Sequence, residues 1–154
     1  MAEYSADAVQ TVQPGGFFVF TTTVVPCDRG LIGHNDGTPI FSLDGWRPSN
    51  YGCCCNRNKP TVYDTHLGFN VALAEGATVA PIMVAIAVDG VALSITEMDS
   101  TPAAVGDFNH LSNEMSVPIL RTCCQTVAVQ NIGTQPISVK NLRIKFARPD
   151  LAGY

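Results

Sequence analysis

The chain has 154 residues and a mass of 16.4 kDa, the size of a single domain that can bury a sizeable core. Charged residues make up only 14% of the sequence, against roughly 25% in an average soluble protein. We therefore expect partner molecules, most simply further copies of the chain, to cover part of the surface. The net charge of −4 argues against nucleic acid as a ligand, and no apolar run approaches the ~18 residues of a membrane-spanning helix.

The beginning of the chain is predicted to form short strands separated by turns. Residues 9–12, 17–25 and 38–43 are rich in β-branched and aromatic side chains, which favour strands. We interpret residues 1–13 as an N-terminal arm with the first short strand, and residues 14–154 as one domain. The arm is expected to reach a neighbouring subunit or a shell of other proteins.

A long irregular loop is predicted at residues 46–62, which hold three consecutive cysteines and two large aromatic side chains. Trp46 and Tyr51 are candidates for surface recognition because aromatic side chains are enriched in contact surfaces. The alternative is that they fold back over the edge of the domain. After the loop, apolar and polar residues alternate from residue 66 to residue 73, the pattern of a strand with one buried face.

Residues 79–93 are predicted to form a β-hairpin with Asp89 and Gly90 as its two-residue turn. Both faces of the first strand are apolar, so we expect both to be covered. One face would lie on the core. The other, which carries Met83, Ala85 and Ala87, is a candidate surface for packing between copies of the chain.

The last third of the chain predicts further strands. Residues 102–108 are the only plausible helical turn. Strands are expected at 115–119, where Pro118 favours the edge of a sheet, and at 125–130 and 137–146 on either side of a turn.

The apolar positions of the final strand change parity after Val139, because the next ones are Leu142 and Ile144. One extra residue near Lys140-Asn141 would produce this change, so a β-bulge is predicted there. Eight or more short strands at this spacing indicate an all-β domain, most simply an antiparallel jelly-roll β-sandwich.

Six cysteines are many for a reduced cytosolic protein and indicate oxidising surroundings. Disulfides within or between subunits are one interpretation, and buried free thiols are the alternative. The natural pairings join Cys27 to the triplet and add a bridge to the later pair. Metal binding is disfavoured because adjacent cysteines chelate one ion poorly. The candidate positions are Cys27, Cys53, Cys54, Cys55, Cys123 and Cys124.

No catalytic or metal-binding pattern is visible in the sequence. The isolated histidines His34, His66 and His110 are interpreted as surface or loop residues. The segments 34–37 and 44–45 match turns better than an ordered calcium loop. We therefore expect no enzymatic activity, no metal and no cofactor.

Two stretches carry a resemblance to a known superfamily: residues 79–93, and the terminal pair of strands around Asn131. In these stretches the chain resembles the trimeric jelly rolls of the tumour necrosis factor and complement globular-head superfamily. It is more specifically similar to small proteins of gut Firmicutes and their phages. The resemblance implies a homotrimer that acts by surface recognition without enzymatic activity. The residues of the second similarity are Ala2-Glu3-Tyr4, 8–12, 86–90, 101–105 and 121–127.

The expected function is that of a structural virion protein, a decoration protein on a phage head. Its partners would be itself, as a homotrimer, and the major capsid protein or neighbouring subunits, reached through the N-terminal arm. The acidic start of the chain lacks the pattern of a secretory signal, so we expect synthesis in the bacterial cytoplasm and release by lysis. The alternative is an extracellular or cell-surface assembly or adhesion protein that binds glycans through the 46–62 loop.

Overall fold

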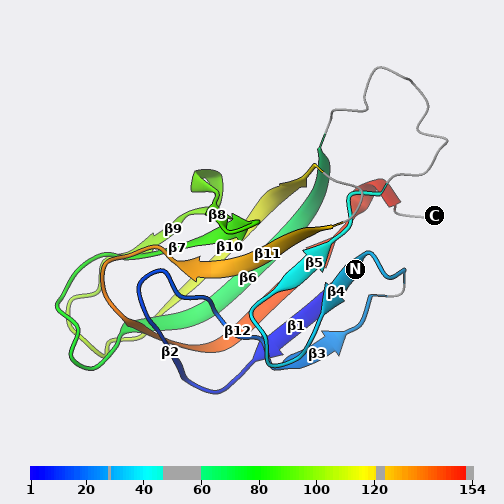
Figure 1. Ribbon diagram of the computed structural model, residues 1–154. Coiled ribbons are helices and arrows are strands. Elements are labelled where there is room, and N and C mark those ends of the chain that lie inside the picture. Colours follow the sequence, from blue (N-terminus) through cyan, green and yellow to red (C-terminus); the bar gives the residue numbers. More distant parts are fainter. Residues whose placement is uncertain (28, 47–59, 121–123, 152–154) are drawn as a thin grey trace.

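The computed structural model describes residues 1–27, 29–46, 60–120 and 124–151. Their strands form two antiparallel sheets, and η2 (Ser94–Thr96) and η3 (Pro149–Leu151) are short 3₁₀ helices (Figure 1). The strands are β1 (Ala2–Ala6), β2 (Gln10–Val12), β3 (Thr22–Val25), β4 (Ile32–His34), β5 (Phe41–Leu43), β6 (Thr61–Leu73), β7 (Ile82–Val88), β8 (Val91–Ala92), β9 (Met98–Ser100), β10 (Asn109–Ile119), β11 (Gln125–Asn131) and β12 (Ile137–Ala147).

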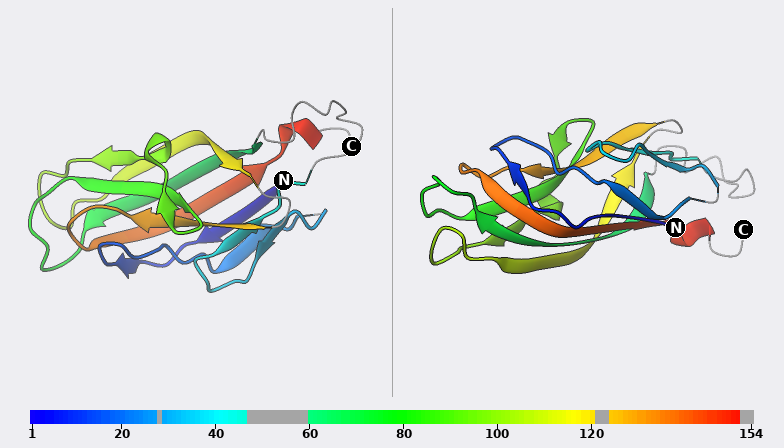
Figure 2. Two further views of the ribbon diagram at one scale, coloured as in Figure 1. Left: turned by 45° about the horizontal axis from the view of Figure 1, so that its top comes forward. Right: turned by 90° about the horizontal axis from the view of Figure 1, so that it is seen from below.

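The two sheets lie face to face, so the predicted β-sandwich is confirmed (Figure 2). Sheet A has the strand order β10-β6-β12-β1-β3, and β2 pairs with the beginning of β12. Sheet B has the order β4-β5-β11-β7-β8, and β9 pairs with the beginning of β7. The long strands β6, β10 and β12 make sheet A a broad surface with one face on the core.

The first residues of the chain are an interior strand of sheet A rather than a free arm. β1 lies between β12 and β3, with Ala2 opposite Phe146 and Tyr4 opposite Ile144. The side chains of Ala2 and Tyr4 are buried. The prediction of an arm that reaches a neighbouring subunit is therefore wrong, because the backbone of β1 is already paired along both edges.

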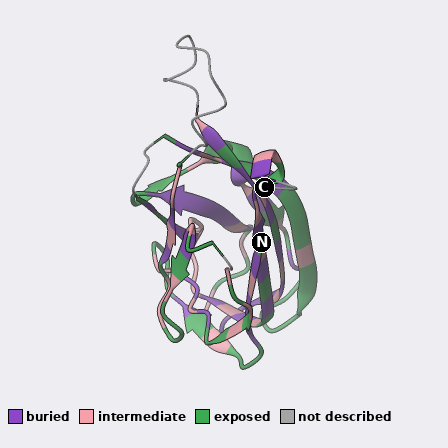
Figure 3. Cartoon of the chain, turned by 90° about the vertical axis from the view of Figure 1, so that its right-hand side faces the viewer, coloured by how far each residue is buried: buried purple, intermediate pink, exposed green. Residues whose placement is uncertain are grey.

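Buried residues lie on both sheets (Figure 3). The core that they form is rich in aromatic rings. Phe41 of sheet B contacts Phe146 of sheet A with ring centroids 5.1 Å apart. Phe20 packs on the Phe41 ring with centroids 5.2 Å apart. Phe18 meets Phe69 edge to face at 5.2 Å. These edge-to-face contacts are a preferred geometry of aromatic pairs and join the two sheets.

Two sequence features of the strands are confirmed. Asp89 and Gly90 both have positive φ, 50° and 82°, as the predicted two-residue hairpin turn requires. The register of β12 against β6 shifts between Lys140 and Arg143, and Asn141 has a φ of 53°, so the predicted bulge is present. The bulge turns Leu142 and the apolar residues after it back to the core.

Other predictions need correction. Residues 102–108 form a turn with Gly106 at a φ of 87°, and no helix. β6 begins at Thr61, so the strand starts inside the range assigned to the loop.

β10 does lie at an edge of sheet A, as Pro118 indicates. No helix in the described part of the chain has the length and apolar composition needed to cross a membrane.

Arg148 fixes the start of the 46–62 segment to the end of the chain. Its side chain is buried and donates hydrogen bonds to the carbonyl oxygens of Asp44 and Trp46 and to the carboxylate of Asp150. The hydroxyl of Tyr63 donates to the same Asp44 carbonyl at 2.6 Å. Hydrogen bonds to a buried cation are among the stronger ones in proteins, so this cluster holds one end of the sandwich together.

Candidate functional site

A polar surface covers the outer face of sheet A. Along β6, Leu67, Phe69 and Val71 are buried in the core, because successive side chains of a strand alternate between the two faces. The residues between them point outward, and β1, β12 and β10 show the same alternation. Since these strands are paired in register, their outward side chains line up in rows across the sheet.

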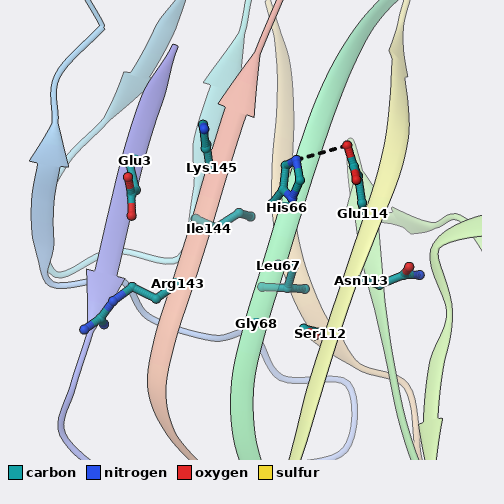
Figure 4. Close-up of a pocket in the computed structure, with 10 residues that line it drawn as sticks. All are labelled: Glu3, His66, Leu67, Gly68, Ser112, Asn113, Glu114, Arg143, Ile144 and Lys145. Carbon is teal, nitrogen blue, oxygen red and sulfur yellow. Dashed lines mark ion pairs between the residues drawn. The ribbon is translucent and has the colours of Figure 1, made fainter.

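The first row runs Glu3, Lys145, His66 and Glu114, each opposite the next on the adjacent strand. His66 Nε2 lies 3.1 Å from Glu114 Oε1, and both side chains are more than half exposed (Figure 4). Glu3 and Lys145 are neighbours, yet their charged ends point away from each other. Among the residues that the structure describes, neither group has a hydrogen-bond or ion-pair partner. A free carboxylate and a free ammonium therefore stand on the same row.

The second row runs Ser5, Arg143, Gly68 and Ser112. The guanidinium of Arg143 turns toward β1, where it donates to Asp7 Oδ1 at 2.7 Å. Because Gly68 has no side chain, a hollow of about 520 Å³ opens over it. Besides residues of the first two rows, Leu67, Asn113 and Ile144 line this hollow. We call this feature the Gly68 groove.

A third row continues the surface beyond the Gly68 groove with Lys140, Asn70 and His110. His110 Nδ1 lies 3.0 Å from Asn70 Oδ1; because that oxygen only accepts, the imidazole donates from Nδ1. The ammonium of Lys140 lies 4.2 Å from the centre of the Phe108 ring, a cation–π contact. Phe108 is 40% exposed, so an aromatic ring borders the polar surface at this end.

The groups in the Gly68 groove suit hydrogen bonding to a polar ligand. His66 and Ser112 share no hydrogen bond, so the pairing that activates a serine nucleophile is not formed between them. Within the described ranges, no three metal-ligating side chains lie close enough to hold an ion. The groove instead presents carboxylate, ammonium and hydroxyl groups on paired strands.

A second hollow of about 340 Å³ lies beside Met1, Cys27 and η3. Burial raises the pKa of the Cys27 thiol, but the backbone N–H groups of Arg29, Ile32 and Leu31 outweigh it and leave the pKa below its ordinary value. The loop after β3 therefore stabilises the thiolate form of Cys27.

The structure tests the cysteine predictions only in part. Cys27 is a free thiol, so the pairing expected for it is not formed in this structure. Cys124 is not free. The triplet at 53–55 and Cys123 lie outside the described residues, and disulfide bonding there stays a prediction.

Of the two aromatic candidates of the loop, Trp46 lies outside the Gly68 groove. Trp46 is 42% exposed, and its backbone is fixed by the side chains of Asp44 and Arg148. Tyr51 lies outside the described residues. Recognition through these two rings stays a prediction.

The side chains of the predicted packing surface on β7 are mostly buried within a single copy of the chain. Ala85 and Ala87 are each only 1% exposed, and Met83 is half-buried. The expectation that both faces of this strand are covered is confirmed. Its extension to packing between copies is wrong for the two alanines, because their small side chains have no surface left for a partner.

The histidines differ in environment more than the sequence indicates. The His34 side chain is fully buried, with its ring stacked on Phe41 at 4.3 Å and each ring nitrogen against a backbone carbonyl. The interpretation of His34 as a surface or loop residue is therefore wrong. His66 and His110 do lie on the surface, as expected, and both belong to the rows on sheet A.

The Gly68 groove is not predicted from the sequence, although one signal for it is present there. The alternation around His66, Gly68 and Asn70 predicts which residues face outward. It does not show that Glu3 and Glu114, far apart in sequence, share a row with His66. That arrangement comes from the pairing of β1, β12, β6 and β10.

Comparison with known proteins identifies the fold. No protein-family model and no curated sequence matches the chain. Among solved structures, it is similar to the globular domain of zebrafish complement 1qA, with a TM-score of 0.56, 9% identity and 94% of each chain covered. This similarity, together with the two antiparallel sheets, confirms the predicted jelly roll of the complement-head type.

Two further similarities have lower TM-scores. Pika GITRL aligns with a TM-score of 0.39 and 11% identity over 97% of this chain and 99% of that one. A family 35 carbohydrate-binding module from Clostridium thermocellum aligns with a TM-score of 0.38 and 15% identity, over 92% and 95%. Below a TM-score of 0.5 such superpositions add nothing to the assignment of the fold.

Proposed function

We propose that this protein is a non-enzymatic coat subunit that assembles with copies of itself. The observation that carries the proposal is a set of exposed apolar side chains on β8, on η2 and just after β10. Val91, Ile95 and Leu120 are 67%, 73% and 70% exposed. Exposed apolar groups of this size, in a chain with few charges, are typical of contact surfaces. We call these three residues the apolar tip.

Contacts within the chain link Leu120 to the turn before Val91. The backbone N–H of Leu120 donates to the side chain of Gln125, which in turn donates to Asp89 in the turn before Val91. Ile95 lies in η2, which follows β8 directly and contacts β7 and β10. Burial of apolar surface contributes about 25 cal/mol per Å², so covering three such side chains favours association.

The proposed assembly is a homotrimer that decorates a phage head. The resemblance to trimeric jelly rolls supports three copies, and the complement-head fold supports the same architecture. Synthesis in the bacterial cytoplasm and release by lysis complete this proposal. Because β1 is built into sheet A, attachment to the major capsid protein would use the folded surface.

The assembly is tested by light scattering coupled to size exclusion. The wild-type chain should elute as three copies. Ile95→Glu with Leu120→Glu should give folded monomers, because two carboxylates would have to be buried at the contact. Val79→Glu is the matched control, since Val79 is 51% exposed but lies outside the apolar tip, and it should stay trimeric. A monomeric wild type would overturn the proposal.

The location is tested by density-gradient fractionation of the producing culture with mass spectrometry of this chain. Recovery with DNA-filled particles in stoichiometric amounts is expected for a head-decoration protein. Recovery with cell envelopes or bare fibres would contradict that role. It would favour the alternative of an extracellular or surface assembly protein, in which the exposed side chain of Trp46 would contribute to adhesion.

A further inference from the structure

We propose that the Gly68 groove binds a neutral, hydroxyl-rich glycan. The inference stands apart from the coat role, because it uses the outer face of sheet A and leaves the apolar tip free. A volume of about 520 Å³ lies within the usual range of ligand sites, about 300–1,000 Å³. Its groups stand on paired strands, so the site is preformed.

The unpaired groups of the groove match the chemistry of sugar hydroxyls. A hydroxyl group both donates and accepts, and it is satisfied best by a mixture of acceptors and donors. Glu3 supplies an acceptor carboxylate and Lys145 a donor ammonium, and neither has a partner among the described residues. Ser112 adds a hydroxyl. These groups border one hollow from β1, β12 and β10.

The balance of charge selects a neutral ligand. Two carboxylates, Glu3 and Glu114, and two cations, Arg143 and Lys145, line the groove. These four charges sum to zero, so an ion of either sign would gain little net attraction from them. A neutral molecule can use all of these groups as hydrogen-bonding partners, and hydrogen bonds to charged groups are stronger than those between neutral groups.

The third row provides room and an aromatic ring for a further sugar unit. Asn70 lies two positions along β6 from Gly68, roughly 7 Å at the usual rise of a strand. Phe108 borders this end, next to Lys140. An aromatic ring with polar side chains beside it can cover the apolar face of a ligand while its edge is hydrogen-bonded. The surface therefore fits a short chain of sugars rather than a single one.

The floor of the groove allows a sharp test. A Cβ atom at Gly68 would lie 3.6 Å from Ser112 Cβ and 3.8 Å from His110 Cε1, which are ordinary contacts. Gly68→Val should therefore fold while filling the hollow. Gly33→Val is the matched control, because Gly33 lies in β4 of sheet B and its Cβ would meet Ser42 Cβ at the same 3.6 Å. Lys145→Met removes one donor without filling the hollow.

The probes are cellotetraose, mannotetraose and laminaritetraose, titrated into the assembled protein by calorimetry and followed by NMR of the sugar protons. At least one of these sugars should bind the wild-type protein. Its affinity should be about tenfold or more lower for Gly68→Val and for Lys145→Met, and unchanged for Gly33→Val. Tetragalacturonate and chitosan tetramer are the charged comparisons.

Failure of all three neutral probes to bind would overturn the inference, as would binding of only a charged one. Size exclusion with light scattering is run on the same samples. If Gly68→Val alone splits the assembly, the groove is a contact between copies and the glycan inference is wrong. If Ile95→Glu with Leu120→Glu gives monomers that still bind a neutral probe, the groove functions without assembly.

Discussion

At the scale of single residues, Asn141 determines which face of sheet A the later side chains of β12 point to. Its left-handed backbone, with a φ of 53°, creates the bulge that changes the parity of β12. Its N–H group also lies 3.3 Å from the carbonyl oxygen of Asp7. Asparagine adopts this conformation more easily than most residues because its short side chain can hydrogen-bond locally.

Substitution at Asn141 should separate the backbone requirement from the side chain. Asn141→Gly should change the free energy of unfolding by only a few tenths of a kcal/mol. Asn141→Val should lower it by about 1–3 kcal/mol, because a β-branched residue is strained at positive φ. Urea unfolding measures both. The control is Ser138→Val in the regular part of β12, where valine is well suited; equal losses at 138 and 141 would contradict the role of the bulge.

At the scale of elements, β1 is the strand whose position most changes the interpretation of the molecule. It joins β12 to β3 through backbone pairing on both edges and buries Ala2, Tyr4 and Ala6. The ring of Tyr4 also packs against His34 and Phe41 of sheet B. Burial raises the pKa of Tyr4 to about 12, with the charges of Cys27 and Asp36 adding to it, so the hydroxyl stays protonated at neutral pH.

Removal of residues 1–6 should abolish cooperative folding. The deletion removes the strand between β12 and β3, so that the facing edges of these two strands lose their backbone pairing and the core beneath is exposed. Circular dichroism during thermal unfolding would show loss of the sharp transition. Glu3→Gln changes only the outer face of β1 and should keep the transition. A deletion variant that still unfolds cooperatively would mean that β1 is a detachable arm.

The elements that sequence predicts well are those with a clear alternation of apolar residues. β6, β11 and β12 have this pattern, β7 is instead an unbroken apolar run of strand length, and the turn at Asp89-Gly90 has a distinctive composition. β1 was missed as a core strand because Ala2 and Ala6 are weak apolar signals beside Glu3 and Ser5. Short strands such as β4 have too few residues to show a period.

The rows of the candidate site depend on partners that no local pattern identifies. His66 lies opposite Glu114 on one side and Lys145 on the other, at separations of dozens of residues. Outward-facing positions can be predicted from alternation, but the register between strands is decided by packing of the buried face and by the turns. The polar residues of the Gly68 groove therefore become neighbours only once the fold is known.

At the scale of the whole molecule, the proposed assembly makes stability depend on concentration. If the trimer is the folded form that hides the apolar tip, mass action stabilises it as the protein concentration rises. The midpoint of thermal unfolding should increase by a few degrees over a hundredfold rise in concentration, and scanning calorimetry measures this. Ile95→Glu with Leu120→Glu should remove the dependence. A wild-type midpoint that does not change with concentration would contradict assembly through this surface.

The pairing of β1 with β12 also determines when the molecule can finish folding during its synthesis. Ala2 is made 144 residues (146 − 2) before Phe146, yet the two lie opposite each other in sheet A. At the usual speed of translation, about 5–20 residues per second, β1 waits roughly ten seconds or more for its partner to leave the ribosome. During that time the apolar surfaces of the unfinished sandwich are exposed. Nascent chains of this protein are therefore expected to depend on protection by chaperones until the final strand closes sheet A.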